Sequence, residues 1–199
     1  MMNKLHPPAS PAPLRDFMTK KVLLLIDWDN FFLSLYDSFG PDKMQIDYRL
    51  QALLQWISQN IGELAGGYGF VFAPEHLTLS FQQMCVQNQL RLVTCPKRPL
   101  ADPKRNLKTG YMMQEEDTVD ETLIWFGKMM MRHPDVKFIC LVAGDDDYVE
   151  LFEEASHYNV RRVLAPPTLK SLSLSQGLVS LADKHPLTHK KMILRLDEL

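Results

Sequence analysis

The sequence has few cysteines, and none of them stands in a pattern that binds zinc. Cys85, Cys95 and Cys140 are odd in number, lack the spacing of metal ligands and lie in apolar segments. Small secreted domains are usually held together by several disulfides, whereas thiols in a reducing compartment stay free. We therefore expect buried free thiols rather than disulfides, and a cytoplasmic protein.

Long apolar runs and an excess of positive charge are also missing. A membrane-spanning helix needs about 20 consecutive apolar residues, and no segment approaches that length, so no membrane partner is expected. Residues 1–19 are rich in proline and lack the apolar stretch of a signal peptide, which predicts a flexible arm. The formal net charge of −2 argues against a generally basic nucleic-acid-binding surface but allows a local basic patch.

The sequence does contain short apolar runs that alternate with longer segments of helical period. The runs of strand length are 21–27, 68–73, 90–94, 136–143 and 160–165. The segments expected to be helical are 30–39, 47–64, 78–88, 117–133, 148–158 and 172–184, with Gly66 and Gly67 ending the second of them. This alternation predicts an α/β domain over residues 20–184, with a mainly parallel central sheet of about five strands flanked by helices. Residues 95–116 are expected to be a long loop, and 185–199 a C-terminal tail.

Two acidic clusters directly follow two of the expected strands. Asp27 and Asp29 follow the run 22–26, and Asp145–Asp147 follow the run 138–144. If both runs belong to one parallel sheet, their carboxylates converge at its C-terminal edge, where open α/β sheets bind ligands. Crowded carboxylates repel one another and need a hard cation, so the pattern predicts Mg²⁺ or Mn²⁺ and phosphate chemistry.

Some of these acids also have a purely structural explanation. Asp29 stands where it would cap the following helix, and Asp147 with Glu150 resembles a capping box. Asp27 and Asp145 are harder to explain in this way, because each follows a run of buried character and would be a costly, partly buried charge. We therefore expect these two acids to be functional.

Three segments together resemble a known family. Ile26-Asp27-Trp28-Asp29-Asn30, then Asp117-Thr118-Val119-Asp120, then Ala143-Gly144-Asp145-Asp146-Asp147-Tyr148 resemble the motifs of NYN domains, a branch of the PIN-like metal-dependent ribonucleases. The resemblance covers about residues 20–183. It implies a three-layer PIN-like fold and an endoribonuclease that hydrolyses RNA phosphodiester bonds with Mg²⁺ or Mn²⁺.

The resemblance also implies roles for individual residues. The implied metal ligands are Asp27, Asp120, Asp145 and Asp147. Asn30 carries no charge and would orient a ligand water or the phosphate. Asp29 and Asp117 are additional candidate acids. The choice between Asp117 and Asp120 stays open, because Glu115–Glu116 replaces the Lys-Gly pair that many relatives have before the helical acid.

The expected loop carries a group of cations that suits an RNA partner. They are Lys97, Arg98, Lys104, Arg105 and Lys108. Such a loop beside a carboxylate site would attract and guide the RNA backbone, and the alternative is a solvated loop without function. The run Met129–Met131 is expected in the core or at a contact between identical subunits.

Two other functions match parts of the pattern. A haloacid-dehalogenase-like phosphatase also has an Asp-x-Asp after its first strand, here Asp27 and Asp29, but Phe31 stands where that family usually has Thr or Val. The second alternative is a PIN-like domain that binds RNA or protein without turnover. A metal titration combined with an RNA cleavage assay separates these functions.

Overall fold

A parallel sheet forms the centre of the protein. The computed structural model describes residues 21–41, 45–71, 79–105 and 112–199, of which 80–81, 102–105 and 112–115 are described as backbone only. The sheet has the strand order β3-β2-β1-β6-β7, and all of its pairings are parallel. Its strands are β1 (Lys21–Asp27), β2 (Glu63–Val71), β3 (Leu90–Thr94), β6 (Val136–Val142) and β7 (Arg161–Leu164).

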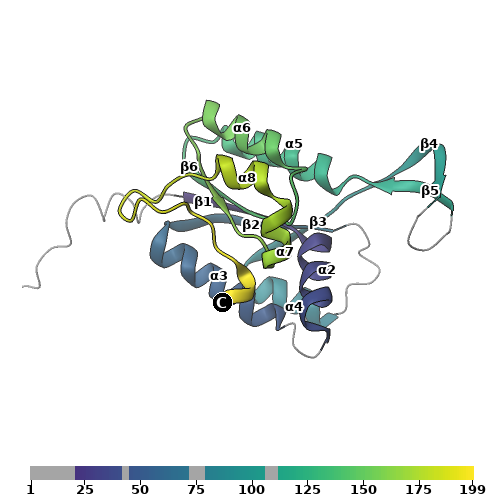
Figure 1. The fold of residues 1–199 in the computed structure, drawn as a ribbon, viewed down its shortest axis with the longest axis horizontal. Helices are drawn as coiled ribbons and strands as arrows, with labels where there is room; N and C mark the ends of the chain where they lie inside the picture. Colours follow the sequence, from purple (N-terminus) through teal and green to yellow (C-terminus); the bar gives the residue numbers. More distant parts are fainter. Residues whose placement is uncertain (1–20, 42–44, 72–78, 106–111) are drawn as a thin grey trace, which may run out of the picture.

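Helices cover both faces of this sheet, as Figure 1 shows. One face carries α2 (Trp28–Phe39), α3 (Ile46–Asn60) and α4 (Leu79–Gln87). The other carries α5 (Val119–Met131), α6 (Val149–His157) and α8 (Gln176–Leu181). The predicted three-layer α/β fold with a parallel sheet is confirmed. Within the described residues, no helix is both long and apolar enough to cross a membrane.

The two central strands explain why the sequence shows continuous apolar runs. Residues Val22–Ile26 of β1 and Phe138–Val142 of β6 are completely buried. Side chains that alternate along β1 pack into two separate cores, with Leu24 on the α2–α3 side and Leu23 on the α5–α6 side. A strand buried on both faces needs apolar residues at every position. Cys85, Cys95 and Cys140 are buried and free, as expected.

The helix α3 ends earlier than predicted. It stops at Asn60, and the Gly66–Gly67 pair that was expected to end it lies inside β2 instead. A Cβ atom at Gly67 would lie 2.5 Å from the Leu90 side chain in the neighbouring strand β3. Gly67 therefore allows close packing between these strands, and the prediction that the two glycines stop a helix was wrong.

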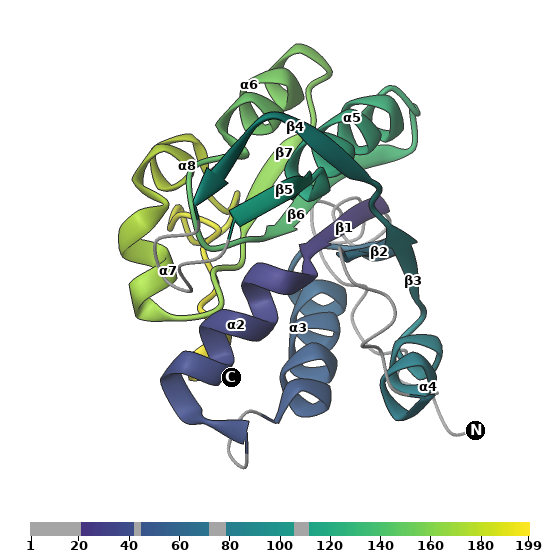
Figure 2. The same cartoon turned by 90° about the vertical axis from the view of Figure 1, so that its right-hand side faces the viewer.

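Residues 95–116 also differ from the prediction. They contain β4 (Lys97–Arg105) and β5 (Met112–Asp117), which pair as an antiparallel ribbon with an irregularity between Pro99 and Lys104. The ribbon projects away from the three layers in Figure 1, and in Figure 2 this side of the molecule faces the viewer. Proline lacks a backbone donor and usually argues against a strand, so Pro99 and Pro103 concealed this one in the sequence.

The C-terminal region packs against the domain. The predicted helix 172–184 is two shorter helices, α7 (Leu169–Leu174) and α8, which meet at the buried residue Ser175. Residues 185–199 were expected to be a tail, yet the amide of Leu164 donates to the Met192 carbonyl (3.0 Å) and the amide of Leu194 donates back to Leu164 (2.9 Å). The segment therefore extends the sheet beyond β7, and it ends in a short 3₁₀ helix, η3 (Leu196–Glu198).

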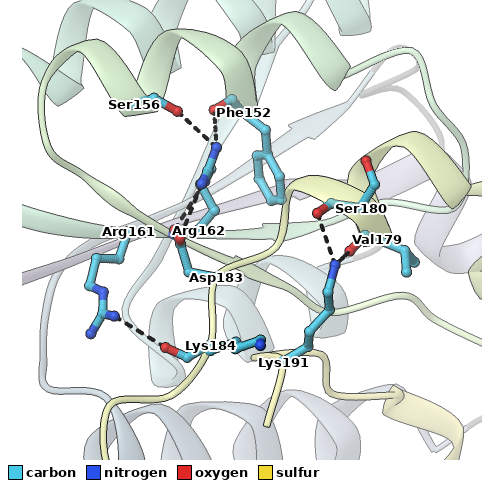
Figure 3. Close-up of polar contacts among 9 residues, drawn as sticks. All are labelled: Phe152, Ser156, Arg161, Arg162, Val179, Ser180, Asp183, Lys184 and Lys191. Atoms are coloured by element: carbon cyan, nitrogen blue, oxygen red, sulfur yellow. Dashed lines mark hydrogen bonds and ion pairs between the residues drawn. The ribbon is translucent and has the colours of Figure 1, made fainter. Parts of the chain in front are cut away.

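A partly buried ion pair connects this region to β7 and α6 (Figure 3). The Arg162 guanidinium donates to both carboxylate oxygens of Asp183, at 2.9 and 3.0 Å, and to Ser156 Oγ at 2.8 Å. Partial burial favours the neutral form of Asp183, but the hydrogen bonds and charge of Arg162 outweigh it and hold the Asp183 pKa below its ordinary value. We call these residues, with Phe152, whose carbonyl accepts from the same guanidinium, the Arg162 cluster.

Candidate functional site

The candidate site lies at the carboxyl ends of β1 and β6, the two neighbouring central strands. From β1 the chain continues to β2 and β3 on one side, whereas β6 and β7 lie on the other. The strand order therefore reverses between β1 and β6, and open α/β sheets bind ligands in the crevice at such a switch point. Asp27 is the last residue of β1, and Asp145 follows the end of β6 closely.

Asp27 and Asp120 meet at the hydroxyl group of Tyr148. The Tyr148 oxygen lies 2.7 Å from Asp27 Oδ2 and 2.5 Å from Asp120 Oδ1. Asp27 is 5% exposed and Tyr148 is fully buried. One phenol proton can be donated to only one carboxylate at a time, so two hydrogen bonds require a second proton on one of the carboxyl groups.

Asp145 is held by Asn30. The Asn30 side-chain amide donates to Asp145 Oδ2 at 2.9 Å, and Asn30 Oδ1 accepts from Ser34 Oγ at 3.3 Å. The backbone amide of Asn30 donates to Asp27 Oδ1 at 3.1 Å, so Asp27 caps α2. A side chain at Gly144 would collide with Asn30 Oδ1, and Gly144 therefore permits this contact.

The three carboxylates Asp27, Asp120 and Asp145, which we call the aspartate cluster, lie in one another's electric field. Burial raises the pKa of Asp27 to about 7, although Tyr148 and Asn30 donate hydrogen bonds to it, and the charges of Asp120 and Asp145 raise it further. Burial raises the pKa of Asp120 and of Asp145 as well, and the charge of Asp147 adds to both shifts. Burial also raises the pKa of Tyr148, so its hydroxyl stays protonated.

The other acids of the last motif have different positions. Asp147 is exposed, and its backbone amide donates to Asp145 Oδ1 at 3.4 Å. Tyr148 is the N-cap residue of α6 and no side chain caps that helix, so Asp147 does not form a capping box. Asp146 accepts from the amides of Gly177 (2.9 Å) and Leu178 (3.1 Å) and thereby caps the start of α8.

The two additional candidates lie outside the aspartate cluster. Asp29 is half-buried in the first turn of α2 but does not cap it, because Asp27 does. Asp117 is exposed at the end of β5, and its carboxylate accepts a long hydrogen bond (3.4 Å) from the Val119 amide. Asp120, one helical turn later, is the acid that reaches Tyr148 and the cluster.

The cluster matches a divalent cation by donor type but not by spacing. Carboxylate oxygens are the ligands that Mg²⁺ and Mn²⁺ prefer. Across the part of the chain that the structure describes, however, no three acidic, histidine or cysteine side chains stand close enough to hold a metal ion. The Tyr148 hydroxyl lies between Asp27 and Asp120 instead. In this arrangement the residues do not form a metal centre.

The structure describes the side chains of only some of the basic residues of the ribbon. Arg98 is paired with Glu116 (2.6 Å) and Glu121 (2.9 Å), so its charge is already balanced. Lys97 pairs in register with Asp117 at the root of the ribbon, where an open pocket of about 390 Å³ includes the exposed side chain of Trp125. Lys104 and Arg105 are described as backbone of β4, and Lys108 lies outside the described residues.

Two residues of the candidate site were not recognised from the sequence. Tyr148 and Gly144 belong to the motif that carries the family resemblance, but neither was given a role. Tyr148 contacts Asp27 across 121 positions of the chain, which no local pattern reveals. The glycine had a local signal, because a glycine between a buried strand and an acidic triplet often marks a close backbone approach.

Comparison with known proteins supports the fold and leaves the function open. No family model matches the chain, and no curated protein matches it. Among solved structures, a protein of unknown function from Vibrio parahaemolyticus is similar, with 17% sequence identity and a TM-score of 0.61. The match covers 90% of this chain and 94% of that one. At this identity the likeness shows a shared fold alone.

Proposed function

We propose that this protein is a metal-dependent ribonuclease of the NYN type, a PIN-like endoribonuclease that uses Mg²⁺ or Mn²⁺. The observation that carries the proposal is the convergence of Asp27, Asp120 and Asp145 at the switch point of the sheet. They come from three separate segments, as the three motifs of the resemblance require. The free buried thiols support a cytoplasmic location.

A purely structural role accounts poorly for this cluster. Burying carboxylates together costs free energy unless a cation or enough hydrogen-bond donors compensate. Among the described residues, no lysine, arginine or histidine pairs with Asp27, Asp120 or Asp145. Acids with raised pKa values at a ligand-binding edge are a typical mark of a functional site.

The protein residues have separable roles in this proposal. A bound divalent cation would polarise the phosphate and lower the pKa of a bound water. Asp27, Asp120 and Asp145 would provide its carboxylates, with Asp147 at the exposed rim. Asn30 fixes the orientation of the Asp145 carboxylate. The ribbon, whose strand β5 ends three residues before Asp120, is the candidate path for RNA.

One observation favours a second candidate, a PIN-like module that binds RNA or protein without turnover. The Tyr148 hydroxyl bonds to both Asp27 and Asp120, and this arrangement satisfies the two acids without a metal ion. A domain that had lost catalysis would keep such a contact and keep the fold.

The test is cleavage of labelled single-stranded RNA with Mn²⁺, with Mg²⁺ and with chelator. We expect cleavage in both metals and none in chelator. Asp27→Asn and Asp145→Asn should each reduce the rate by more than roughly 100-fold, beyond the loss typical of an outer-shell partner. Asp37→Asn, on the exposed side of α2, is the matched control and should cleave normally.

Two results would contradict the proposal. Wild-type protein that binds RNA but shows no metal-dependent cleavage of any tested sequence would favour the binding module. Full turnover by folded Asp27→Asn and Asp145→Asn variants would remove these acids from the site. Circular dichroism of each variant establishes that it is folded.

A further inference from the structure

A turn near the C-terminus gathers positive charge on one part of the surface. Residues 184–191, which we call the basic turn, contain no acidic residue and three lysines, Lys184, Lys190 and Lys191. Arg161 adds a fourth cation, because its guanidinium donates to the Lys184 carbonyl at 3.1 Å (Figure 3). In the part of the chain that the structure describes, none of these four side chains forms an ion pair with a carboxylate. The neighbouring acid, Asp183, is paired with Arg162 instead.

Hydrogen bonds hold the basic turn in one conformation. The His185 ring accepts from the backbone amides of Leu187 and Thr188 through Nδ1, both at 3.3 Å. Its proton is therefore on Nε2, which donates to the carbonyl of Asn60 at the end of α3 (3.1 Å). The Lys191 ammonium donates to backbone carbonyls at the end of α8. A surface that is already ordered loses little conformational entropy when a partner binds.

A pocket opens between the basic turn and α3. Its volume is about 190 Å³, and its lining includes the half-buried indole of Trp56 together with Met192, Lys190 and Lys191. Proteins bind single-stranded nucleic acid with this combination, because bases stack on an aromatic ring while cations neutralise the phosphates. An acidic peptide would also neutralise the cations, but its acidic side chains have no ring that could stack on the indole. The surface therefore fits RNA better.

The basic turn lies far from the aspartate cluster. Figure 1 shows it at the end of the molecule opposite the ribbon β4–β5. Arg161 pairs in register with Phe138 near the start of β6, whereas Asp145 follows the end of that strand. At about 3.3 Å per residue, the two ends are roughly 20 Å apart. A nucleotide bound at the basic turn therefore cannot reach the acids, and this surface can hold RNA but not cleave it.

We propose that the basic turn, with Arg161 and the Trp56 pocket, is a second binding surface for single-stranded RNA. Phosphates contact Arg161, Lys184 and Lys190, and one base enters the pocket beside Trp56. The inference rests on the proposed function for its choice of RNA as the polyanion, but the surface is separate from both the ribbon and the aspartate cluster. It holds one part of an RNA chain while another part lies at the carboxyl edge of the sheet.

The phosphate contacts are tested by the salt dependence of binding, measured as the fluorescence anisotropy of labelled oligouridylate. Lys184→Gln and Lys190→Gln each remove one exposed charge. Each should lower the logarithmic salt slope by about 0.7, and the double variant should lower it by about 1.4, because fewer counterions are released. Arg91→Gln is the matched control for either single variant. It removes an exposed charge from β3, at the opposite side of the sheet, and should leave the slope unchanged.

The base contact is tested by tryptophan fluorescence. In a Trp125→Phe background the remaining tryptophans are Trp56 and Trp28, and Trp28 is only 3% exposed. Oligouridylate should therefore quench the emission of Trp56 in this background. Trp56→Leu should weaken binding roughly 10-fold, since base stacking is lost, without changing the salt slope. Emission that stays unchanged at saturating oligouridylate would overturn the base contact.

Different outcomes separate this inference from the proposed function. An unchanged salt slope in the double variant would overturn the second surface, even if the wild type cleaves RNA. A lowered slope would support the surface even if no RNA is cleaved, and then the ribonuclease assignment alone would fall. Labelled polyglutamate is the second probe. Wild-type protein that binds polyglutamate through the two lysines but does not bind oligouridylate would overturn the choice of RNA and indicate an acidic protein partner.

Discussion

The Arg162 cluster and the aspartate cluster both contain partly or fully buried carboxylates, but they differ in what surrounds the charge. Asp183 meets a guanidinium through two side-chain hydrogen bonds, and its pKa is lowered. Asp27 meets a neutral phenol and lies near two other carboxylates, and its pKa is raised to about 7. Burial opposes ionisation of both acids. The hydrogen bonds and positive charge of Arg162 outweigh it at Asp183, whereas burial prevails at Asp27, whose carboxylate neighbours add to its effect. The first cluster has a paired counter-charge within the protein, whereas the second has none among the described residues, and our proposed function assigns it a cation.

The largest effect is expected on RNA cleavage, and it tests whether the aspartate cluster is a catalytic site. Asp120→Ser should reduce Mn²⁺-dependent RNA cleavage by more than roughly 100-fold, because it removes a carboxylate from the cluster. Asp117→Ser should keep most of the activity, because Asp117 is exposed and lies outside the Tyr148 contacts. Cleavage rates of both purified variants are compared with the wild type. The reverse pattern would move the site by one helical turn.

The two clusters should give the metal-free protein opposite pH dependences. The folded-state pKa of Asp27 is about 7, above its ordinary value of 3.8. The unfolded chain therefore releases a proton that the folded protein keeps, so stability is full below about pH 4 and falls as the pH rises towards 7. The decrease is roughly 4 kcal/mol at most. Asp183 has a lowered pKa, so its contribution is present above about pH 4 and is lost as the pH falls further.

Urea unfolding in chelator at several pH values measures both dependences. Asp27→Asn should reduce the decrease in the free energy of unfolding between about pH 4 and 7. Asp183→Asn should reduce the loss of that free energy at acid pH. An Asp27→Asn variant that keeps the full slope would show that another group is responsible. Saturating Mn²⁺ should restore stability near pH 8 in the wild type and not in Asp27→Asn.

The same contrast explains what could be predicted from the sequence. The strands β1 and β6 and the position of Asp27 and Asp145 were predictable, because a strand buried on both faces leaves a local run of apolar residues. The choice between Asp117 and Asp120 was not. Both acids stand near the start of one helix, and only the distant contact with Tyr148 distinguishes them.

The ribbon shows a different limit of sequence analysis. None of the β4–β5 side chains that the structure describes belongs to either core, so this part has no buried face to mark it as strand. Pro99 and Pro103 add a false signal for a loop. The pairing of Arg98 with Glu116 and Glu121 was also hidden. Counting the cations along the sequence therefore overestimated the positive charge of the described part of this segment, because the charge of Arg98 is balanced by two glutamates.

The next prediction compares the contribution of the Arg162 cluster to stability with that of the aspartate cluster. Asp183→Asn should destabilise the protein by about 1–3 kcal/mol, because it leaves the Arg162 guanidinium partly buried without its counter-charge. Asp27→Asn should not destabilise the metal-free protein at pH 8, because asparagine also caps helices and like-charge repulsion is relieved. Thermal melting in chelator compares the two. Equal destabilisation by both substitutions would remove the distinction between the clusters.

The smallest effect is expected from Arg98, whose ion pairs are exposed. Its side chain is 51% accessible, and solvent screens its attraction to Glu116 and Glu121. Arg98→Gln should therefore leave the melting temperature unchanged within error. A clear loss would mean that ion pairs stabilise this protein irrespective of burial, and the comparison with the Arg162 cluster would lose its basis.

Arg98 also tests the proposed path for RNA. Because its charge is already balanced by two glutamates, Arg98→Gln should change the salt dependence of RNA binding little. Neutralising Lys104 and Arg105 together should flatten that dependence, since each lost phosphate contact removes about 0.7 from the logarithmic slope for a single strand. Mn²⁺ affinity should stay unchanged in both variants, because short carboxylate contacts hold the ion. Affinities measured at several ionic strengths decide between the outcomes. An unchanged slope in the double variant would place the RNA path away from the ribbon and leave its cations as solvated surface.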